Sequence, residues 1–412
     1  QLQNCSPRCA QRRSERKMAA VGSVEKNPCP ICLEEMGCVD CTLPPAGLTR
    51  LPCRHFFHKS CVDALQQFGV SNVCPMCRAA IPQTPTQLND EASSNYFMLL
   101  SRVDSGEANW NELSAEDQSM QGEIVRMWRE SAEQGHSHAQ HNLGVVYEKG
   151  QGVPVDYYES LRFYHLSALQ GDPKSQCNVG IMCYHGMGCL QSFEKALEWY
   201  TLAAEQKDAQ ACCNIGVLFS RGRGMAVNNT LATHWFDCAV KLGHMGAAFA
   251  LAGMYREGNG VAPDDAAAVD LYRLAGENGF AQAQFSLGEL YSQGEGGLPV
   301  DANEAAKWYK LAANQGHRKA LYVLGLMTEY GDGGIEQSGR IACRLYALAA
   351  AQGHSQAHFQ LGVILAQGVL VPQDVARAKY HLSTAHELGV EQAGEVLEHE
   401  IFREFVRGDN EH

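Results

Sequence analysis

Cysteine and histidine residues gather near the N-terminus at spacings that suit metal binding. Ten of the 17 cysteines lie in residues 1–82, mostly in C-x2-C pairs. The candidate ligands are Cys29, Cys32, Cys53, His55, His58, Cys61, Cys74 and Cys77. Zinc prefers thiolate and imidazole ligands, and a closed structural site takes four of them in a tetrahedron. Eight ligands therefore predict two zinc ions.

The chemistry that such a module offers is structural. Roughly 55 residues bury too little apolar surface to fold alone, so metal binding must supply most of the folding free energy. With four protein ligands on each ion, no position is open for water and no bound thiolate can act as a nucleophile. Cys38 and Cys41 form a further C-x2-C pair, which cannot close a site by itself, so we interpret them as free thiols. The module is expected to act through its surface.

The ligand order C-x2-C, C-x-H, H-x2-C, C-x2-C resembles the RING finger family, in its variant with two central histidines. The resemblance implies interleaved sites, with Cys29, Cys32, His58 and Cys61 on one zinc and Cys53, His55, Cys74 and Cys77 on the other. Two sequential fingers remain an alternative, although His55 and His58 would then crowd each other. PHD-like fingers match less well, because they have one central histidine.

The RING resemblance also implies a ubiquitin-conjugating enzyme and ubiquitin as partners. Ile31, Leu65 and Pro75 occupy positions that contact the conjugating enzyme in that family. Arg78 follows the last ligand, where active ligases often carry an arginine that bridges the conjugating enzyme and ubiquitin. Leu65 replaces the commoner Trp and offers less contact area. Taken singly, each residue also fits a packing, turn or solvent-exposed role.

The rest of the chain is repetitive. A period of 36 or 37 residues begins at Gly135 and produces seven units up to residue 388. In one unit, Gly288 lets two helices approach, Gly294 suits a left-handed cap and Asp301 suits the N-cap of a second helix. An aromatic residue such as Tyr309 and small residues at helical spacing predict a packed core between helices.

This template resembles the Sel1-like repeat, a relative of the tetratricopeptide repeat. The resemblance implies an all-α solenoid of helix pairs that binds a protein or peptide substrate. One histidine position recurs in the template, so the repeat rather than a metal explains its members: His136, His244, His317 and His354. The cysteines of this region are interpreted as core thiols.

The predicted fold is a small zinc-stabilised α+β RING domain joined to an all-α solenoid of Sel1-like repeats. The expected segments are a basic, disordered tail (1–27), the zinc module (28–82), a polar linker (83–113), an N-terminal half-repeat or cap (114–134), seven repeats (135–388) and a C-terminal cap helix and tail (389–412). A short helix around Tyr96–Val103 is expected within the linker.

Charge and hydropathy exclude several function classes. The 412 residues carry 33 Lys and Arg against 46 Asp and Glu, which argues against general binding of nucleic acid or anionic membranes. The acidity lies in residues 83–412, with 23 basic and 40 acidic groups. No apolar run reaches the length of about 18 residues that a transmembrane helix needs. The repeats contain no phosphate loop, dinucleotide fingerprint or nucleophile–base arrangement.

Two functions compete at this level. In the first, the chain is a RING-type ubiquitin ligase: the zinc module binds a ubiquitin-conjugating enzyme and the solenoid recruits a protein substrate, with no covalent ubiquitin intermediate on this chain. In the second, it is a non-catalytic adaptor with a structural zinc module. Arg78 and Ile31 favour the ligase, whereas Leu65 keeps the adaptor open. Clustered cysteines indicate a reducing compartment, the cytoplasm or also the nucleus.

Overall fold

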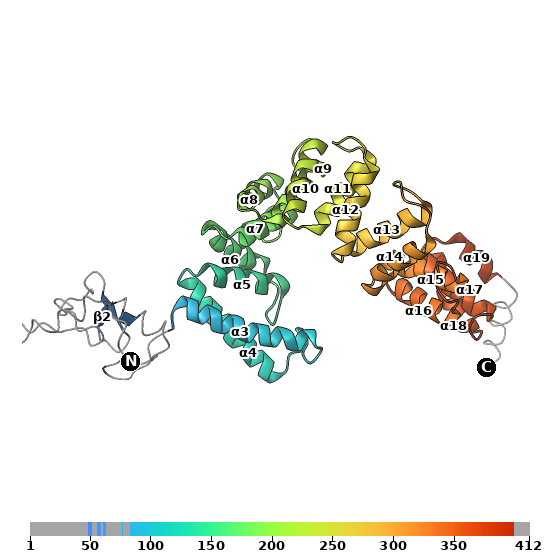
Figure 1. Cartoon of the computed structure of the whole chain (residues 1–412). Helices are drawn as coiled ribbons and strands as arrows, with labels where there is room; N and C mark the ends of the chain where they lie inside the picture. The colour runs from blue at the N-terminus through green and yellow to red at the C-terminus, as the bar shows by residue number, and fades with distance from the viewer. Residues whose placement is uncertain (1–47, 52–55, 59–60, 63–75, 77–82, 399–412) are drawn as a thin grey trace, which may run out of the picture. The chain divides into compact units, whose positions relative to one another are not determined.

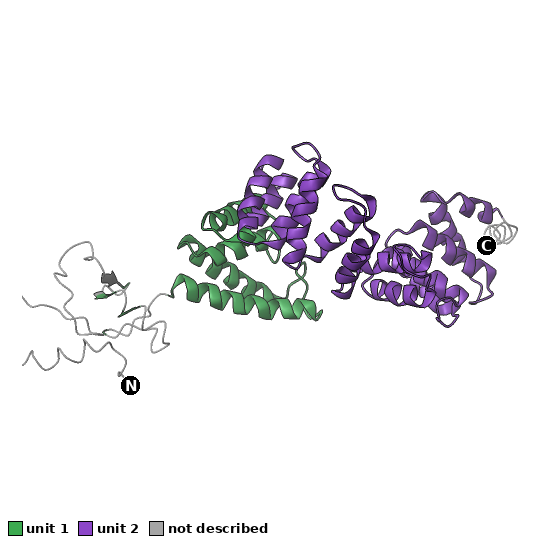
Figure 2. Ribbon diagram, turned by 45° about the horizontal axis from the view of Figure 1, so that its top comes forward, with its two compact units in different colours: residues 1–175 green, residues 176–412 purple. Residues whose placement is uncertain are grey.

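The computed structural model describes residues 48–51, 56–58, 61–62, 76 and 83–398. Paired helices dominate the described part (Figure 1). Two compact units divide the chain at Ser175, as Figure 2 shows. None of the described helices is both long and apolar enough to span a membrane.

A short hairpin lies within the predicted zinc module. Strand β1 (Leu48–Arg50) pairs antiparallel with β2 (Phe56–His58), so that Leu48 lies opposite His58. Phe57 is fully buried, and Leu51 and Val62 are almost completely buried. The few described residues of the module therefore combine a strand pair with a small apolar core.

The first helices of the array come directly after this module. They are α3 (Pro85–Asp104), α4 (Ala115–Glu133), α5 (Ser137–Lys149), α6 (Tyr157–Leu169) and α7 (Pro173–His185). Thr84 begins α3 with a capping box: its Oγ1 accepts the Gln87 backbone N–H, and the Gln87 side chain accepts the Thr84 backbone N–H. The proline at the first helical position also suits this start.

Helix α3 corrects the linker prediction for residues 83–113. It is 20 residues long, where only a short helix around Tyr96–Val103 is expected from the sequence. Its Leu88, Ala92 and Leu99 are buried in one core with residues of α4 and α5. Residues 114–134 form α4, which Ser114 caps as the sequence suggests, and α4 packs against α3.

Replacing Leu99 with alanine should destabilise this first pair by about 2–5 kcal/mol, because the fully buried side chain would leave a cavity. Amide hydrogen exchange of α3 and α4 in the full chain should accelerate accordingly. The matched control is Phe97→Ala on the same helix, where the side chain is 66% exposed and the expected change is within about 0.5 kcal/mol. Equal exchange in the two variants would restore the linker interpretation.

The second unit continues the same pattern of helix pairs. It begins within α7, at Gln176. The helices that follow are α8 (Phe193–Glu205), α9 (Ala209–Arg221), α10 (Asn229–Lys241), α11 (Met245–Glu257), α12 (Asp265–Glu277), α13 (Ala281–Gln293), α14 (Ala302–Asn314), α15 (Arg318–Tyr330), α16 (Gly339–Ala351), α17 (Ser355–Gln367), α18 (Val375–Glu387) and α19 (Glu391–Leu397).

The backbone geometry and hydrogen bonds of one unit explain each feature of the predicted template. Gly294 ends α13 in the left-handed conformation, with φ of 71°. The Asp301 side chain accepts the Asn303 and Glu304 backbone N–H groups and so caps α14. A Cβ atom at Gly288 would lie 2.5 Å from a Tyr309 ring carbon, so only glycine permits this approach. The predicted repeat of helix pairs is confirmed.

Candidate functional site: the zinc module and the repeat surface

The structure describes two of the eight predicted zinc ligands. His58 ends strand β2, and Cys61 follows it as a partly buried thiol outside any disulfide. Imidazole and thiolate three residues apart form a donor pair that suits zinc rather than the harder cations, which prefer oxygen. The other six ligands lie outside the described residues: Cys29, Cys32, Cys53, His55, Cys74 and Cys77. His58 and Cys61 thus supply two donors of the kind that zinc prefers.

The predicted partner contacts, Ile31, Leu65, Pro75 and Arg78, also lie outside the described residues. Met76 is not among the predicted contacts, but it is described and is 57% exposed. The signal was available, since Met76 is a bulky apolar residue beside Pro75 in the last C-x2-C pair. An unbranched thioether side chain adapts readily to an apolar partner surface. Met76 therefore adds a fifth candidate contact to the predicted four.

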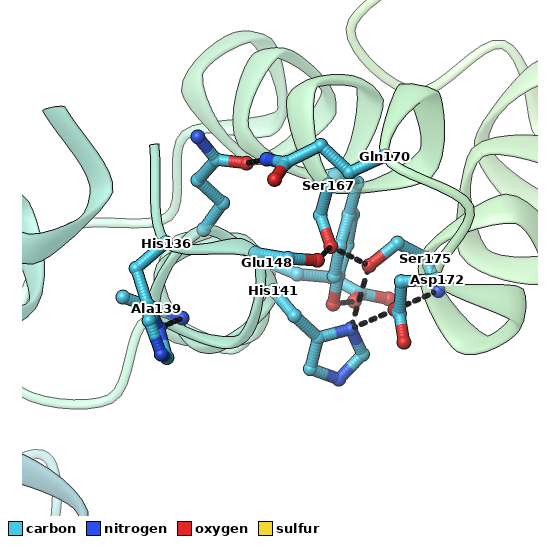
Figure 3. A network of polar contacts seen from close by, with 11 residues as sticks. His136, Ala139, His141, Glu148, Ser167, Gln170, Asp172 and Ser175 are labelled. Atoms are coloured by element: carbon cyan, nitrogen blue, oxygen red, sulfur yellow. Dashed lines mark hydrogen bonds and ion pairs between the residues drawn. The ribbon is translucent and has the colours of Figure 1, made fainter. Parts of the chain in front are cut away.

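A polar network in the first unit places a serine, a histidine and an aspartate together (Figure 3). His141 of α5 directs Nδ1 to Ser175 Oγ at 2.8 Å and to Asp172 Oδ2 at 3.5 Å. Asp172 also accepts the Ser175 backbone N–H at 2.8 Å and so caps the start of α7. Ser175 Oγ continues to Ser167 Oγ of α6 at 2.9 Å.

This network is structural rather than catalytic. A hydrolytic triad uses one imidazole nitrogen for the serine and the other for the carboxylate, whereas here Nδ1 meets both. Ser175 is completely buried, so no substrate can reach its hydroxyl. Burial alone would raise the pKa of Asp172, but hydrogen bonds from His141 and Ser175 hold it well below its usual range. The carboxylate thus stays charged as a helix cap.

The recurrent histidines of the template serve as helix caps. His244 Nδ1 accepts the Ala247 backbone N–H at 2.9 Å. Three other histidines cap their helices in the same way, each accepting the backbone N–H of the residue three positions later: His136, His317 and His354. Burial lowers the pKa of His244, which favours the neutral ring that a capping acceptor requires. No cluster of three or more metal-ligating side chains occurs within the described ranges.

The thiols of the array have the properties of core side chains. Burial raises the pKa of Cys213 to about 11. Burial and nearby Asp208 raise the pKa of Cys177 still further. Both therefore remain protonated near neutral pH and are poor nucleophiles. The prediction of core thiols holds for these residues.

Stacked helix pairs of one template define a helical repeat protein. The chain belongs to the Sel1 repeat family, whose model matches seven segments: residues 137–172, 173–208, 209–244, 246–280, 281–317, 318–354 and 355–390. A second model, the Ring finger domain, matches residues 27–78. A RING finger is a zinc-binding module, so both predicted family resemblances are confirmed.

Comparisons with known proteins support the two modules separately. A crystal structure of a Sel1 repeat protein from Oxalobacter formigenes is 28% identical, covers 76% of this chain and 89% of its own, and has a TM-score of 0.57. The E3 ubiquitin-protein ligase Praja-2 of Mus musculus is 40% identical over 67 residues. The E3 ubiquitin-protein ligase RNF181 of Xenopus tropicalis is 39% identical over 54 residues.

The two ligase matches are short. They cover 16% and 13% of this chain, and 8% of Praja-2 and 30% of RNF181. The chain therefore shares a zinc module with these ligases and spans less than a third of either one.

Proposed function

We propose that this protein is a RING-type ubiquitin ligase that recruits its substrate through the Sel1 repeats. The observation that carries the proposal is the Ring finger match at residues 27–78. Over 67 and 54 residues, this chain is similar to two proteins named E3 ubiquitin-protein ligases. The order of ligands and the arginine after the last one support the same activity. We place the protein in the cytoplasm, and also in the nucleus.

The proposed mechanism uses proximity rather than covalent catalysis. Ile31, Leu65, Pro75 and the exposed Met76 bind the ubiquitin-conjugating enzyme, while Arg78 holds ubiquitin in the reactive orientation. Two zinc ions, held by the eight Cys and His ligands, cross-link the module that presents these side chains. Ubiquitin passes directly from the conjugating enzyme to a substrate lysine, and holding donor and acceptor together raises their effective concentration.

The short connection between the modules favours this arrangement. Helix α3 begins at Pro85, seven residues after Arg78, so even a fully extended chain spans no more than about 25 Å between them. Helix α3 thus occupies most of the segment that the sequence suggests is a linker. A substrate on the first repeats would stay within a small volume around the bound conjugating enzyme, which increases the rate of transfer.

Separating the modules tests recruitment. A fragment of residues 1–82 ends before the Thr84 cap and so exposes none of the α3 core. With intact zinc content, it should discharge a matched conjugating enzyme to free lysine at close to the full-chain rate. It should lose modification of a target that co-purifies with the full chain, because the target site has been removed. Equal target modification by fragment and full chain would refute the recruitment role.

A further inference from the structure

A pocket of about 400 Å³ is lined by residues of α16, α17 and α18 within the second unit. Figure 1 labels these three helices. Arg340 and Arg344 of α16 and Arg377 of α18 line it, and all three side chains are exposed. None of these guanidinium groups forms an ion pair with any described residue. The carboxylate in the lining, Asp374, accepts the Arg377 backbone N–H at 3.0 Å as the cap of α18.

The local charge opposes that of the surrounding array. Residues 337–386 contain four basic groups and one acidic group, whereas residues 83–412 as a whole carry 23 against 40. Arg340 and Arg344 stand four positions apart on one helix, where like charges repel each other. A cluster of unpaired guanidinium groups attracts anions, and each planar fork can bind a carboxylate through two hydrogen bonds.

The repeat template does not require these arginines. Arg340 and Arg344 correspond to Asn303 and Lys307 one repeat earlier, counted from the N-cap residues Ser338 and Asp301. Arg377 corresponds in the same way to Ile341. Lys307 there pairs with Glu304 at 2.5 Å.

A second pocket in the array provides a useful contrast. It has a volume of about 180 Å³, and its single arginine, Arg256, pairs with Glu295 at 3.8 Å. The arginine of that pocket thus has a carboxylate partner, whereas the three arginines of the pocket on α16–α18 have none among the described residues.

Part of the lining of the pocket on α16–α18 is apolar. Buried Leu361 and Leu365 of α17 form one side, and Val371 and Pro372 of the α17–α18 loop form another. The neighbouring loop residue Val369 is 80% exposed. A small inorganic anion would leave this apolar surface in water, whereas a peptide can cover it with a side chain.

We propose that this pocket binds an acidic segment of a partner protein that carries an apolar side chain beside its carboxylates. The arginines pair with the carboxylates, and the apolar side chain packs against Leu361, Leu365 and Val371. The overall negative charge of the array disfavours a long polyanion such as nucleic acid, whereas a short acidic segment needs only the local arginine cluster. The inference rests on the proposed function for its role, since it names the kind of segment by which a substrate is recruited.

A peptide-binding experiment on the full chain tests the proposal. The probe is a fluorescein-labelled decapeptide in which four Asp and Glu residues flank a Leu-Phe pair. Fluorescence anisotropy should detect binding to the wild type. The triple variant Arg340→Gln, Arg344→Gln, Arg377→Gln should weaken it at least about tenfold, because charge-assisted hydrogen bonds are lost. The exposed positions of these side chains preserve the fold, which circular dichroism checks.

Matched controls separate a specific site from general attraction. The variant Lys307→Gln, Lys310→Gln, Lys319→Gln removes the same charge from exposed positions on α14 and α15 and should keep affinity within about threefold. A peptide with Asn and Gln replacing the acids should not bind, and one with Ser replacing Leu and Phe should bind more weakly.

Three results would overturn the proposal. The first is that the wild type does not bind the probe peptide. The second is that the two triple variants weaken peptide binding equally. The third is that the Ser-substituted peptide binds with the same affinity as the probe and that millimolar inorganic phosphate displaces the probe. The last result would define a simple anion site. Because binding is measured without ubiquitin enzymes, this inference and the ligase activity can fail independently.

Discussion

Replacing Cys61 with serine should abolish ubiquitin transfer while leaving the repeat helices intact. Zinc binding to structural sites of this kind contributes about 10–16 kcal/mol, and in so small a module this free energy is most of the folding free energy. Loss of one ligand should therefore lower the zinc content from about two ions per chain to one or fewer. Metal analysis measures the zinc content, and circular dichroism should show a largely unchanged helical signal, since the array is stabilised by neighbouring repeats.

Cys343→Ser provides the matched control. Cys343 is a partly buried thiol outside any disulfide, and it lies on α16 within the array. This variant should keep both zinc and ubiquitin transfer. Unchanged zinc content in Cys61→Ser would contradict the assigned ligand set. Loss of most helicity on chelation would contradict the independence of the two modules.

Replacing Arg78 with alanine should slow ubiquitin discharge about ten- to a hundredfold at normal zinc content. All eight ligands remain in place, so the fold is preserved. Arg78 is proposed to act where ubiquitin is aligned for transfer, and loss of one charged hydrogen-bonding group there costs roughly 1.5–3 kcal/mol. Single-turnover discharge to excess free lysine measures this effect without any contribution from substrate capture.

Ile31→Ala should instead weaken binding of the conjugating enzyme. Ile31 would bury apolar surface in every bound state, whereas Arg78 would act mainly in the reactive arrangement. Arg50→Ala, on strand β1 and outside the proposed contacts, is the control and should change neither property. If Arg78→Ala matches an active wild type in single-turnover rate, the bridging role is wrong.

The repeat architecture could be predicted from the sequence because its determinants are local. Gly294, Asp301 and the pair of Gly288 with Tyr309 each fix a turn, a cap or a helix contact within one unit. The same period recurs seven times, so each weak signal is reinforced. The RING finger could be predicted for a similar reason, because zinc coordination ties particular residue types to short spacings.

Other features depend on tertiary packing and could not be predicted. The apolar stripe of α3 is sparse and lies among polar residues, and its burial becomes evident only when α4 and α5 cover it. The arginine pocket combines Arg340, Leu361 and Arg377 from three helices. No single segment of the sequence carries that pattern, and charge counts over the whole array hide it.

Autoubiquitination of the purified, zinc-loaded full chain across a panel of ubiquitin-conjugating enzymes tests the central claim most directly. The proposed ligase function predicts ubiquitin conjugates with at least one conjugating enzyme, and none with that enzyme when Cys61→Ser replaces the wild type. Absence of conjugates with every enzyme of the panel, from protein whose zinc content is complete, would contradict the ligase function and favour the non-catalytic adaptor.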